Sequence, residues 1–421
     1  MKDGKIKLIL LGLIILLITD SGYAKYEPVY GYYGSLIGLV VFGAYCIFKL
    51  FYRFKVNSWM VSRSFIVLAL VSVWLFFFSL MMGAGIGPTL RYLCILVSAY
   101  YISSTYEFEK VAVLLTNMLF IFAVAALVMW FMVFLIPESY NLFPVLMFKA
   151  NNSSGKLLEY RTIGLANMLL SNYTVLPRIY SLFWEPGVCQ AYFNIAILLT
   201  LKFFKGKKKV FYLIVFGMGV VLTLSTTGFI TCAVVLLFAL LMRNDSDKRT
   251  NQLLKVGILV LVTVVLLNLE VLIGGDIYES IFGKLSGGGE HTSVASRINS
   301  ITGNIDVIKK HFLFGTGLNQ SSRALKEIGI VTDQTNTLFD CLATFGIIIG
   351  FLFIICWGYF IKKLSTNIVE NAIIILTFLL IFSGEDFIQS LFFYMLLMYG
   401  MTSLVDKKEL CKNKHIRYIN T

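Results

Sequence analysis

The chain has 421 residues, of which 58% are hydrophobic, and a formal net charge of +13. Soluble domains contain about 45–50% apolar residues, so this composition excludes an ordinary soluble domain and indicates a protein embedded in lipid. The positive charge is then a membrane-topology signal and does not indicate a nucleic-acid-binding surface.

Apolar runs recur along the whole chain. A spanning helix needs about 20 apolar residues, and several of the runs are shorter than that. They lie at roughly 6–19, 33–52, 64–82, 89–104, 111–136, 187–204, 210–225, 227–242, 256–274, 338–361, 367–382 and 388–404. We therefore predict an all-α fold, a polytopic membrane helix bundle of about twelve transmembrane helices that forms one integral membrane domain over residues 1–421.

The first run leaves two interpretations open. Residues 1–24 have a basic start, an apolar core and a small-residue end at Gly22-Tyr23-Ala24, which is typical of a cleaved signal peptide. The other interpretation, which we favour, is a retained first helix. Cleavage would remove one span and leave the orientation of the others unchanged.

The distribution of lysine and arginine predicts the orientation. With the N-terminus in the cytoplasm, two thirds of these residues fall on the cytoplasmic side, and the short outer turns carry only Lys25 and Arg91. All six prolines fall on the outer side. We expect a bacterial inner-membrane protein with both termini in the cytoplasm and two long periplasmic loops, 137–187 and 275–336.

The first long loop ends with Arg178 and Glu185, directly before an apolar run. The guanidinium fork of arginine matches phosphate oxygens two at a time, so Arg178 is a candidate for binding an anionic headgroup. Arg161, upstream in the loop, is expected to add to it. The alternative is an ordinary surface ion pair between Arg178 and Glu185.

The second long loop contains an apolar stripe at helical spacing that follows Arg297. The stripe predicts a helix that lies flat on the outer leaflet or packs on the bundle. Arg297 is placed near its N-terminus, where free N–H groups favour anions, and the alternative is a plain interfacial helix. The stripe residues are Ile298, Ile301, Ile305, Ile308 and Phe312.

Four further residues are candidates for binding or for chemistry. His311 and Asn336 flank the end of the second long loop, and Glu385 and Asp386 lie in the last outer turn. An acceptor hydroxyl needs a base, for which Glu185 is the first candidate and Glu385 and Asp386 are the second. The alternatives are a solvated histidine at a helix end, an asparagine helix cap and solvated turn carboxylates.

Taken together, these motifs resemble the O-antigen ligase and polymerase superfamily, which includes the Wzy-type polymerases. The order of the motifs along the outer side carries the resemblance, from about residue 160 to about residue 350. The matching residues are Arg178, Ser181, Phe183, Glu185, Pro186 and Gly187, then Leu224, Ser225, Thr227 and Gly228, then Arg297, Phe314, Gly315 and Gly317, and more loosely Asn336, Leu338 and Gly346.

The resemblance implies a metal-independent glycosyltransferase without a cofactor, acting on a glycan that is carried by a polyprenyl diphosphate. With the chemistry of the outer loops, it leads us to expect catalytic roles for Arg178, Glu185 and Arg297, and substrate binding by Arg161, Asn336, His311, Glu385 and Asp386. The expected product is a surface polysaccharide, either O-antigen or capsule. The expected partners are lipid-linked oligosaccharides, the bilayer and a chain-length regulator, with no nucleic acid.

Two alternative functions stay open. Ligases of this superfamily usually carry a histidine immediately before the asparagine that matches Asn336, and Thr335 stands there, which favours the polymerase. A flippase or other transporter would be expected to show internal repeats and charges at mid-membrane, and the sequence shows neither.

Overall fold

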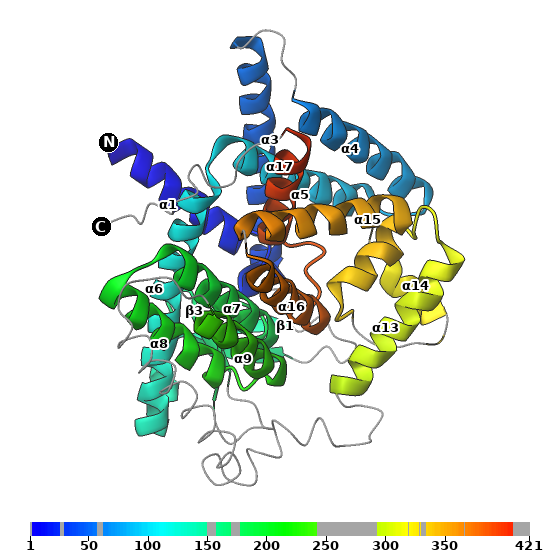
Figure 1. The fold of residues 1–421 in the computed structure, drawn as a ribbon. Helices are drawn as coiled ribbons and strands as arrows, with labels where there is room; N and C mark the ends of the chain where they lie inside the picture. The colour runs from blue at the N-terminus through cyan, green and yellow to red at the C-terminus, as the bar shows by residue number, and fades with distance from the viewer. Residues whose placement is uncertain are drawn as a thin grey trace.

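The computed structural model describes residues 2–25, 29–56, 62–149, 157–169, 177–241, 293–318, 320–327, 329, 334–365 and 367–406. Within these ranges the chain forms a bundle of helices with one small sheet (Figure 1). The helices are α1 (Lys2–Leu17), α2 (Gly22–Lys25), α3 (Val29–Val56), α4 (Arg63–Met81), α5 (Ile86–Thr105), α6 (Phe108–Leu135), η1 (Pro137–Leu142), α7 (Pro186–Phe203), α8 (Gly206–Leu222), α9 (Thr226–Leu241), α13 (Ser293–Lys310), α14 (Ser321–Glu327), α15 (Thr337–Leu364), α16 (Ile368–Gly384) and α17 (Leu391–Val405).

The predicted helical membrane fold is confirmed. Each predicted apolar run that lies among the described residues is a helix, and the run at 256–274 lies outside them. Four helical segments are long and apolar enough to cross a membrane, namely Gly34–Tyr52, Arg63–Met81, Phe108–Leu135 and Thr337–Leu364. The chain is therefore a multi-pass membrane protein, while the count of about twelve spans stays a prediction.

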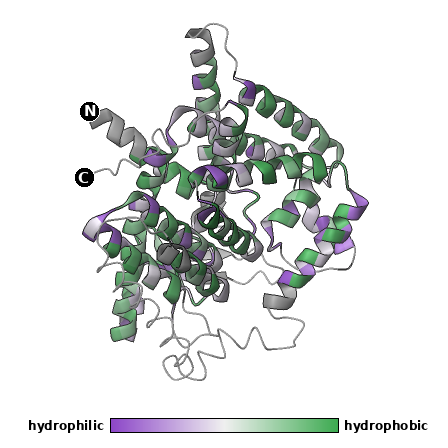
Figure 2. Cartoon of the chain, in the orientation of Figure 1, coloured by the Kyte–Doolittle hydropathy of each residue, from purple (hydrophilic) through white to green (hydrophobic). Residues whose placement is uncertain are grey.

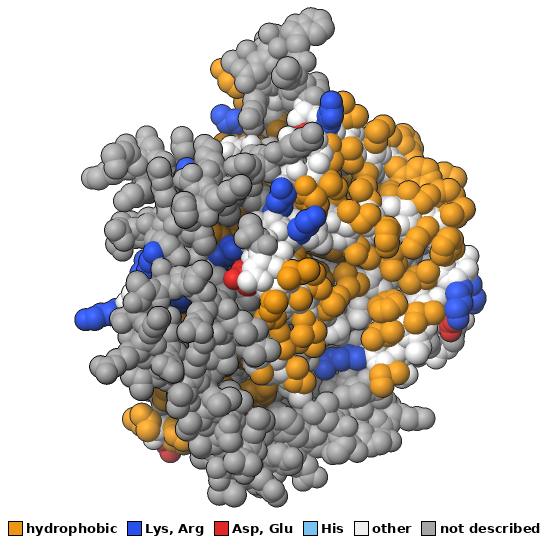
Figure 3. Space-filling model, viewed as in Figure 1, with side chains coloured by type: hydrophobic (Ala, Val, Ile, Leu, Met, Phe, Trp, Pro, Cys, Tyr) orange, Lys and Arg blue, Asp and Glu red, His pale blue; other side chains and the backbone are white. Residues whose placement is uncertain are grey.

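The outward faces of the helices are apolar. Along α4, Leu70 is 67% exposed and Phe77 is 62% exposed, and α3 exposes Phe48 in the same way. Hydrophobic residues cover most of the helical ribbon in Figure 2, and Figure 3 shows them gathered over the upper right of the molecule, where α4 lies. Such a continuous apolar surface is stable against lipid and not against water.

Helix α7 is the centre of the bundle. Every one of its residues, from Pro186 to Phe203, is buried, because α6, α8 and α9 pack around it. Proline occupies its first turn, where its missing N–H has no intrahelical acceptor to lose. Residues 185–187 at the start of this helix are thus fixed by the core of the protein.

One end of the bundle gathers the lysines. Phe108 at the start of α6 contacts Phe203 at the end of α7, Phe360 near the end of α15 and Tyr399 near the end of α17, with ring centroids 5.0–6.1 Å apart. Three described groups of basic residues belong to these helix ends: Lys110, then Lys202, Lys205 and Lys207 to Lys209, then Lys362 and Lys363. We call this the basic end.

The other end is where α7, α9, α15 and α17 begin and where α1, α6, α8 and α16 end; we call it the loop end. These three groups of lysines and the long loops are thus at opposite ends of the described helices, as the charge pattern predicts. The orientation of the two ends across the membrane stays a prediction.

The first long loop contains a sheet that the sequence analysis did not predict. Strands β1 (Val145–Lys149), β2 (Leu157–Ile163), β3 (Ala166–Leu169) and β4 (Arg178–Ser181) pair in sequence order and antiparallel. Gly164, with φ of 58°, starts the two-residue turn between β2 and β3, where glycine accepts a positive φ without strain. Strand β4 leads into α7 and carries Arg178.

The Phe-Gly-x-Gly segment of the second long loop interlocks with a break in α15. Gly346 (φ 70°, ψ 178°) interrupts the helix, and Ile347 N–H donates to Phe312 O at 2.9 Å. Thr316 and Gly317 N–H donate to the carbonyls of Ala343 and Thr344 at 2.8 and 3.0 Å. The loop therefore satisfies main-chain groups that the break frees, as a membrane helix requires.

Candidate functional site

Arg178 is fixed at the loop end by the C-terminus of α8. Its Nε donates to Thr223 O at 2.9 Å and its Nη2 donates to Leu224 O at 3.4 Å. The last carbonyls of a helix carry partial negative charge and favour a cation. Of the donors of this half-buried side chain, Nη1 makes no hydrogen bond to the described residues, so the guanidinium is held in place with donors left for a ligand.

Tyr180 lies in the fields of both Arg178 and Glu185. Burial raises the pKa of Tyr180 to about 12, the positive charge of Arg178 lowers it and the negative charge of Glu185 raises it. The Tyr180 ring also packs edge-on against Tyr160, at 5.3 Å. The phenol therefore stays protonated at neutral pH, and the charges of Arg178 and Glu185 both reach it.

The turn before α17 reaches the start of α7. The carboxylate of Glu385 lies against the backbone of Gly187, where a Cβ on the glycine would overlap it. This contact brings Glu385 to the first turn of α7, two residues from Glu185. Free N–H groups at a helix N-terminus favour a carboxylate there. Glu385 is half-buried and Glu185 is exposed.

The start of α15 is tied to the same turn. The Thr337 hydroxyl donates to Glu385 O at 2.7 Å and accepts from Phe387 N–H at 3.0 Å. Asp386, within this turn, is electrostatically coupled to the buried Asp340 of α15. The turn that carries Glu385 and Asp386 is thus clamped to α15 on one side and to α7 on the other.

Asn336 is a helix cap. Its Oδ1 accepts from Leu338 and Phe339 N–H, both at 3.1 Å, and it is 4% exposed. The cap interpretation, which the sequence left open, is confirmed by this geometry. A substrate-binding role for Asn336 stays a prediction.

Helix α13 is confirmed, but the face that it buries differs from the predicted one. Ser300 and Asn304 are fully buried, whereas Ile298 is 55% exposed and the other stripe isoleucines are half-buried. The reason is hydrogen bonding. Asn304 Nδ2 donates to Gln334 Oε1 at 2.8 Å, and Ser300 Oγ accepts from Thr335 N–H at 3.3 Å.

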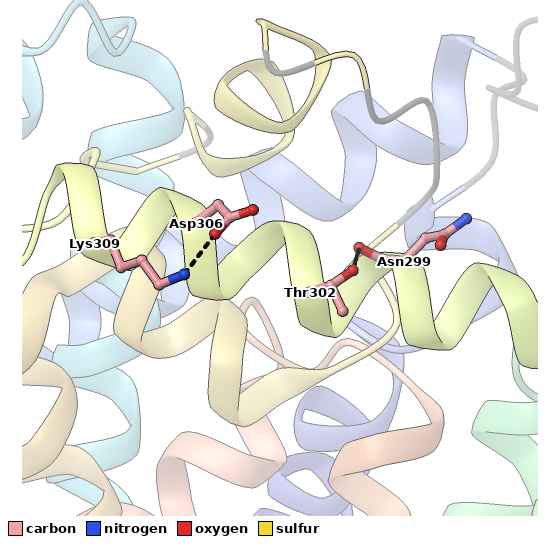
Figure 4. Close-up of polar contacts among 4 residues, drawn as sticks. All are labelled: Asn299, Thr302, Asp306 and Lys309. Atoms are coloured by element: carbon pink, nitrogen blue, oxygen red, sulfur yellow. Dashed lines mark hydrogen bonds and ion pairs between the residues drawn. The ribbon is translucent and has the colours of Figure 1, made fainter.

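The outward face of α13 is polar as well. Figure 4 shows Lys309 paired with Asp306 at 2.9 Å and the Thr302 hydroxyl bonded to Asn299 O. Arg297 lies one turn before Ser300 on the buried polar face, and it is half-buried. Helix α13 contacts residues 334–335, which come directly before Thr337, and the Thr337 hydroxyl bonds Glu385 O. Arg297 is therefore on the helix that docks next to this start of α15.

Two predicted residues lie away from this cluster. Arg161 and Arg178 are two strands apart on opposite faces of the sheet, and Arg161 contacts η1 through Phe143 O (3.2 Å) and the Tyr140 ring (5.2 Å). His311 follows the last turn of α13, about 20 Å along the axis from Arg297. The substrate-binding roles of Arg161 and His311 stay predictions that this arrangement does not support.

The candidate residues at the loop end are thus Arg178 on the end of α8, Glu185 and Glu385 at the start of α7, Asp386 next to Glu385, and Arg297 on α13. The sequence analysis did not predict the contacts that hold these residues in place. These contacts are made by Gly187, Gln334, Thr335 and Thr337, and by the carbonyls at the end of α8 that bind Arg178. A glycine directly after a proline at a helix start was the one signal for the close approach of another segment. Among the described residues, no three or more His, Cys, Asp or Glu side chains are grouped to hold a metal ion.

The fold and the loop end define a multi-pass membrane protein with an anchored arginine, Arg178, and a carboxylate, Glu385, held at the start of α7. Residues 211–355, about a third of the chain, match a family model described as O-antigen ligase. This match confirms the resemblance to the O-antigen polymerase and ligase superfamily over α8, α9, α13, α14 and most of α15. No curated protein matches the chain.

Proposed function

We propose that this protein is a polysaccharide polymerase of the outer face of the bacterial inner membrane. It transfers a growing glycan from its polyprenyl diphosphate carrier to the next lipid-linked repeat unit and so builds O-antigen or capsule. The observations that carry the proposal are the guanidinium of Arg178, anchored on the end of α8, and the carboxylate of Glu385, which lies on Gly187, two residues from Glu185.

The proposed step is a glycosyl transfer. An acceptor hydroxyl oxygen attacks the anomeric carbon of the donor, and the bond from that carbon to the diphosphate oxygen breaks. The diphosphate leaves with the electron pair, and the hydroxyl proton passes to a carboxylate, for which Glu185 is the first candidate and Glu385 and Asp386 are the second.

Arginine suits the leaving group. Negative charge grows on the diphosphate as the bond breaks, and fixed cations stabilise that charge without rearranging. Arg178 is held by hydrogen bonds to the end of α8 before substrate binds, and Arg297 lies on the helix that docks on residues 334–335. This chemistry uses no cofactor and no metal from the protein.

A ligase is the second candidate, because the matching family model is described as O-antigen ligase. Thr335 favours the polymerase over this alternative. Its main-chain N–H bonds Ser300, and its side chain provides a hydroxyl where the ligases usually carry an imidazole base.

The test uses the purified protein in liposomes with lipid-linked repeat units extracted from cells that lack it. A polymerase lengthens the glycan on the carrier lipid, and Arg178→Ala or Arg297→Ala abolishes this while the protein stays folded in the membrane. Transfer to added lipid A-core without lengthening identifies a ligase. Movement of the lipid across the bilayer without either product identifies a flippase, and both results refute the proposal.

A further inference from the structure

A buried carboxylate at the end of α1 connects the two loops of the proposed site. Asp20 is 2% exposed, and its Oδ2 accepts from Thr19 Oγ1 at 2.9 Å, Tyr192 OH at 2.7 Å and Ser390 Oγ at 2.7 Å. Tyr192 belongs to α7 and Ser390 caps α17, so three elements meet at one oxygen. We call these four residues, Thr19, Asp20, Tyr192 and Ser390, the Asp20 brace.

The brace holds the segment that carries Glu185. Gly22 N–H donates to Leu182 O at 3.0 Å, and Ser21 forms an isolated antiparallel bridge with Phe183. The Phe183 ring stacks on Tyr192 at 4.4 Å with an interplanar angle of 18°. Residues 182–183, just before Glu185, are therefore fixed between the end of α1 and the tyrosine that binds Asp20.

The brace also holds the segment that carries Glu385. Leu391 N–H donates to Thr19 Oγ1 at 2.9 Å, and Ser390 N–H donates to Phe387 O at 3.0 Å. Phe387 N–H in turn donates to the Thr337 hydroxyl that binds Glu385 O. The same buried oxygen thus fixes the turn that lays Glu385 on Gly187.

A carboxylate inside a membrane bundle is unfavourable unless it is well bonded, and it commonly marks function. We propose that Asp20 is a positioning residue for glycosyl transfer. It holds the Glu185 and Glu385 loops in the relative position in which the acceptor hydroxyl, the base and the arginines align. The proposal rests on the proposed function and adds to it that the N-terminal segment is part of the active assembly.

The test compares Asp20→Asn, Tyr192→Phe and Ser390→Ala in the liposome polymerisation assay. Positioning acts on the reacting geometry, so each variant is expected to lower kcat about tenfold and to leave KM for the lipid-linked unit within about twofold. Each variant loses a buried hydrogen bond, so thermal stability is expected to fall modestly, while the amount of folded protein in the membrane is expected to match the wild type. Asp306→Asn is the control, because Asp306 pairs with Lys309 on the exposed face of α13.

A second measurement separates positioning from bulk stability. If Asp20 acts through Glu385, Asp20→Asn adds little to the loss that Glu385→Gln causes alone. Losses that only follow the amount of folded protein, or three variants with full kcat, overturn the positioning role. Full activity of Arg178→Ala overturns the proposed function and the positioning role with it; inactive Arg178→Ala with active brace variants overturns the brace alone.

Discussion

Arg178 offers the sharpest test of the site. Arg178→Ala removes the hydrogen bonds to Thr223 O and Leu224 O and the charge that faces the proposed diphosphate. Removing one fixed donor to a developing charge lowers kcat by about 10²–10³-fold. We therefore expect chain lengthening by this variant to fall by at least that factor.

Arg178→Lys separates charge from geometry. Lysine keeps the positive charge, but its single ammonium cannot bind two adjacent carbonyls at 2.9 and 3.4 Å and also present a fork to phosphate oxygens. We expect a loss of about 10–100-fold in kcat, between the wild type and the alanine variant. The carbonyls left without a partner also lower the free energy of unfolding by about 1–3 kcal/mol in both variants.

The assay is glycan lengthening in liposomes, with initial rates divided by the amount of folded protein. Arg323→Ala is the matched control, because Arg323 on α14 is exposed and pairs with Glu327, at 3.2 Å, four residues on. This control is expected to keep full activity. Lengthening by Arg178→Ala at the wild-type rate, or equal activity of the lysine and wild-type proteins, refutes the reasoning.

Three further predictions concern the supports of the site. Gly315→Ala would place a Cβ against Thr344 O at a φ of 73°, and should lower the free energy of unfolding by more than about 2 kcal/mol. Gly329→Ala is the control, because Gly329 has a similar φ of 82° but lies in open space, and it should cost only about 1 kcal/mol. Equal shifts in the melting temperature of the two variants contradict the interlock. Asn304→Ala removes both hydrogen bonds between Asn304 and Gln334 and should cost about 1–3 kcal/mol and slow lengthening by displacing Arg297, and unchanged rates argue against docking of α13. Because the pKa of Tyr180 is raised by burial, the folded state binds more protons than the unfolded state between pH 10 and about 12, so the free energy of unfolding falls as pH rises through this range. Tyr180→Phe should make this fall less steep. An unchanged dependence of unfolding free energy on pH contradicts the burial of the phenol.

The helices of this fold follow closely from the sequence. An apolar run long enough to span the bilayer favours the α-helix, because lipid offers no hydrogen-bond partner to the backbone N–H and C=O groups. The described runs are helices, as predicted. The break between α8 and α9 was also predictable from Ser225 to Gly228, where polar residues and a glycine interrupt an apolar run too long for one crossing.

The sheet and the faces of α13 were not predictable in the same way. Strands of four to seven residues in a loop carry a weak pattern, and their pairing depends on tertiary contacts such as Trp130 Nε1 to Pro177 O at 2.7 Å. In α13, periodicity indicated an isoleucine seam, but Ser300 and Asn304, which bond Gln334 and the main chain of Thr335, are buried together with Val307, while the isoleucines are half-buried or exposed. Hydrogen bonds of buried groups outweighed the apolar pattern there.

The candidate site was predictable as a set of residues but not as an arrangement. The sequence places Arg178 and Glu185 together because they share one short segment before a helix. It gives no indication that Glu385, two hundred residues later, touches Gly187, since that contact depends on how α7, α16 and α17 pack. Arg161 shares the loop of Arg178, yet strand alternation turns it to the other face of the sheet.

The break in α15 has a consequence for biogenesis. Residues 312–317 leave the ribosome before Gly346 does, so the peptide groups that complete the broken helix are synthesised ahead of it. The final pair of helices, α16 and α17, then emerges after this join and supplies the turn with Glu385. Assembly in the order of synthesis can therefore complete the broken helix before the turn that carries Glu385 is added.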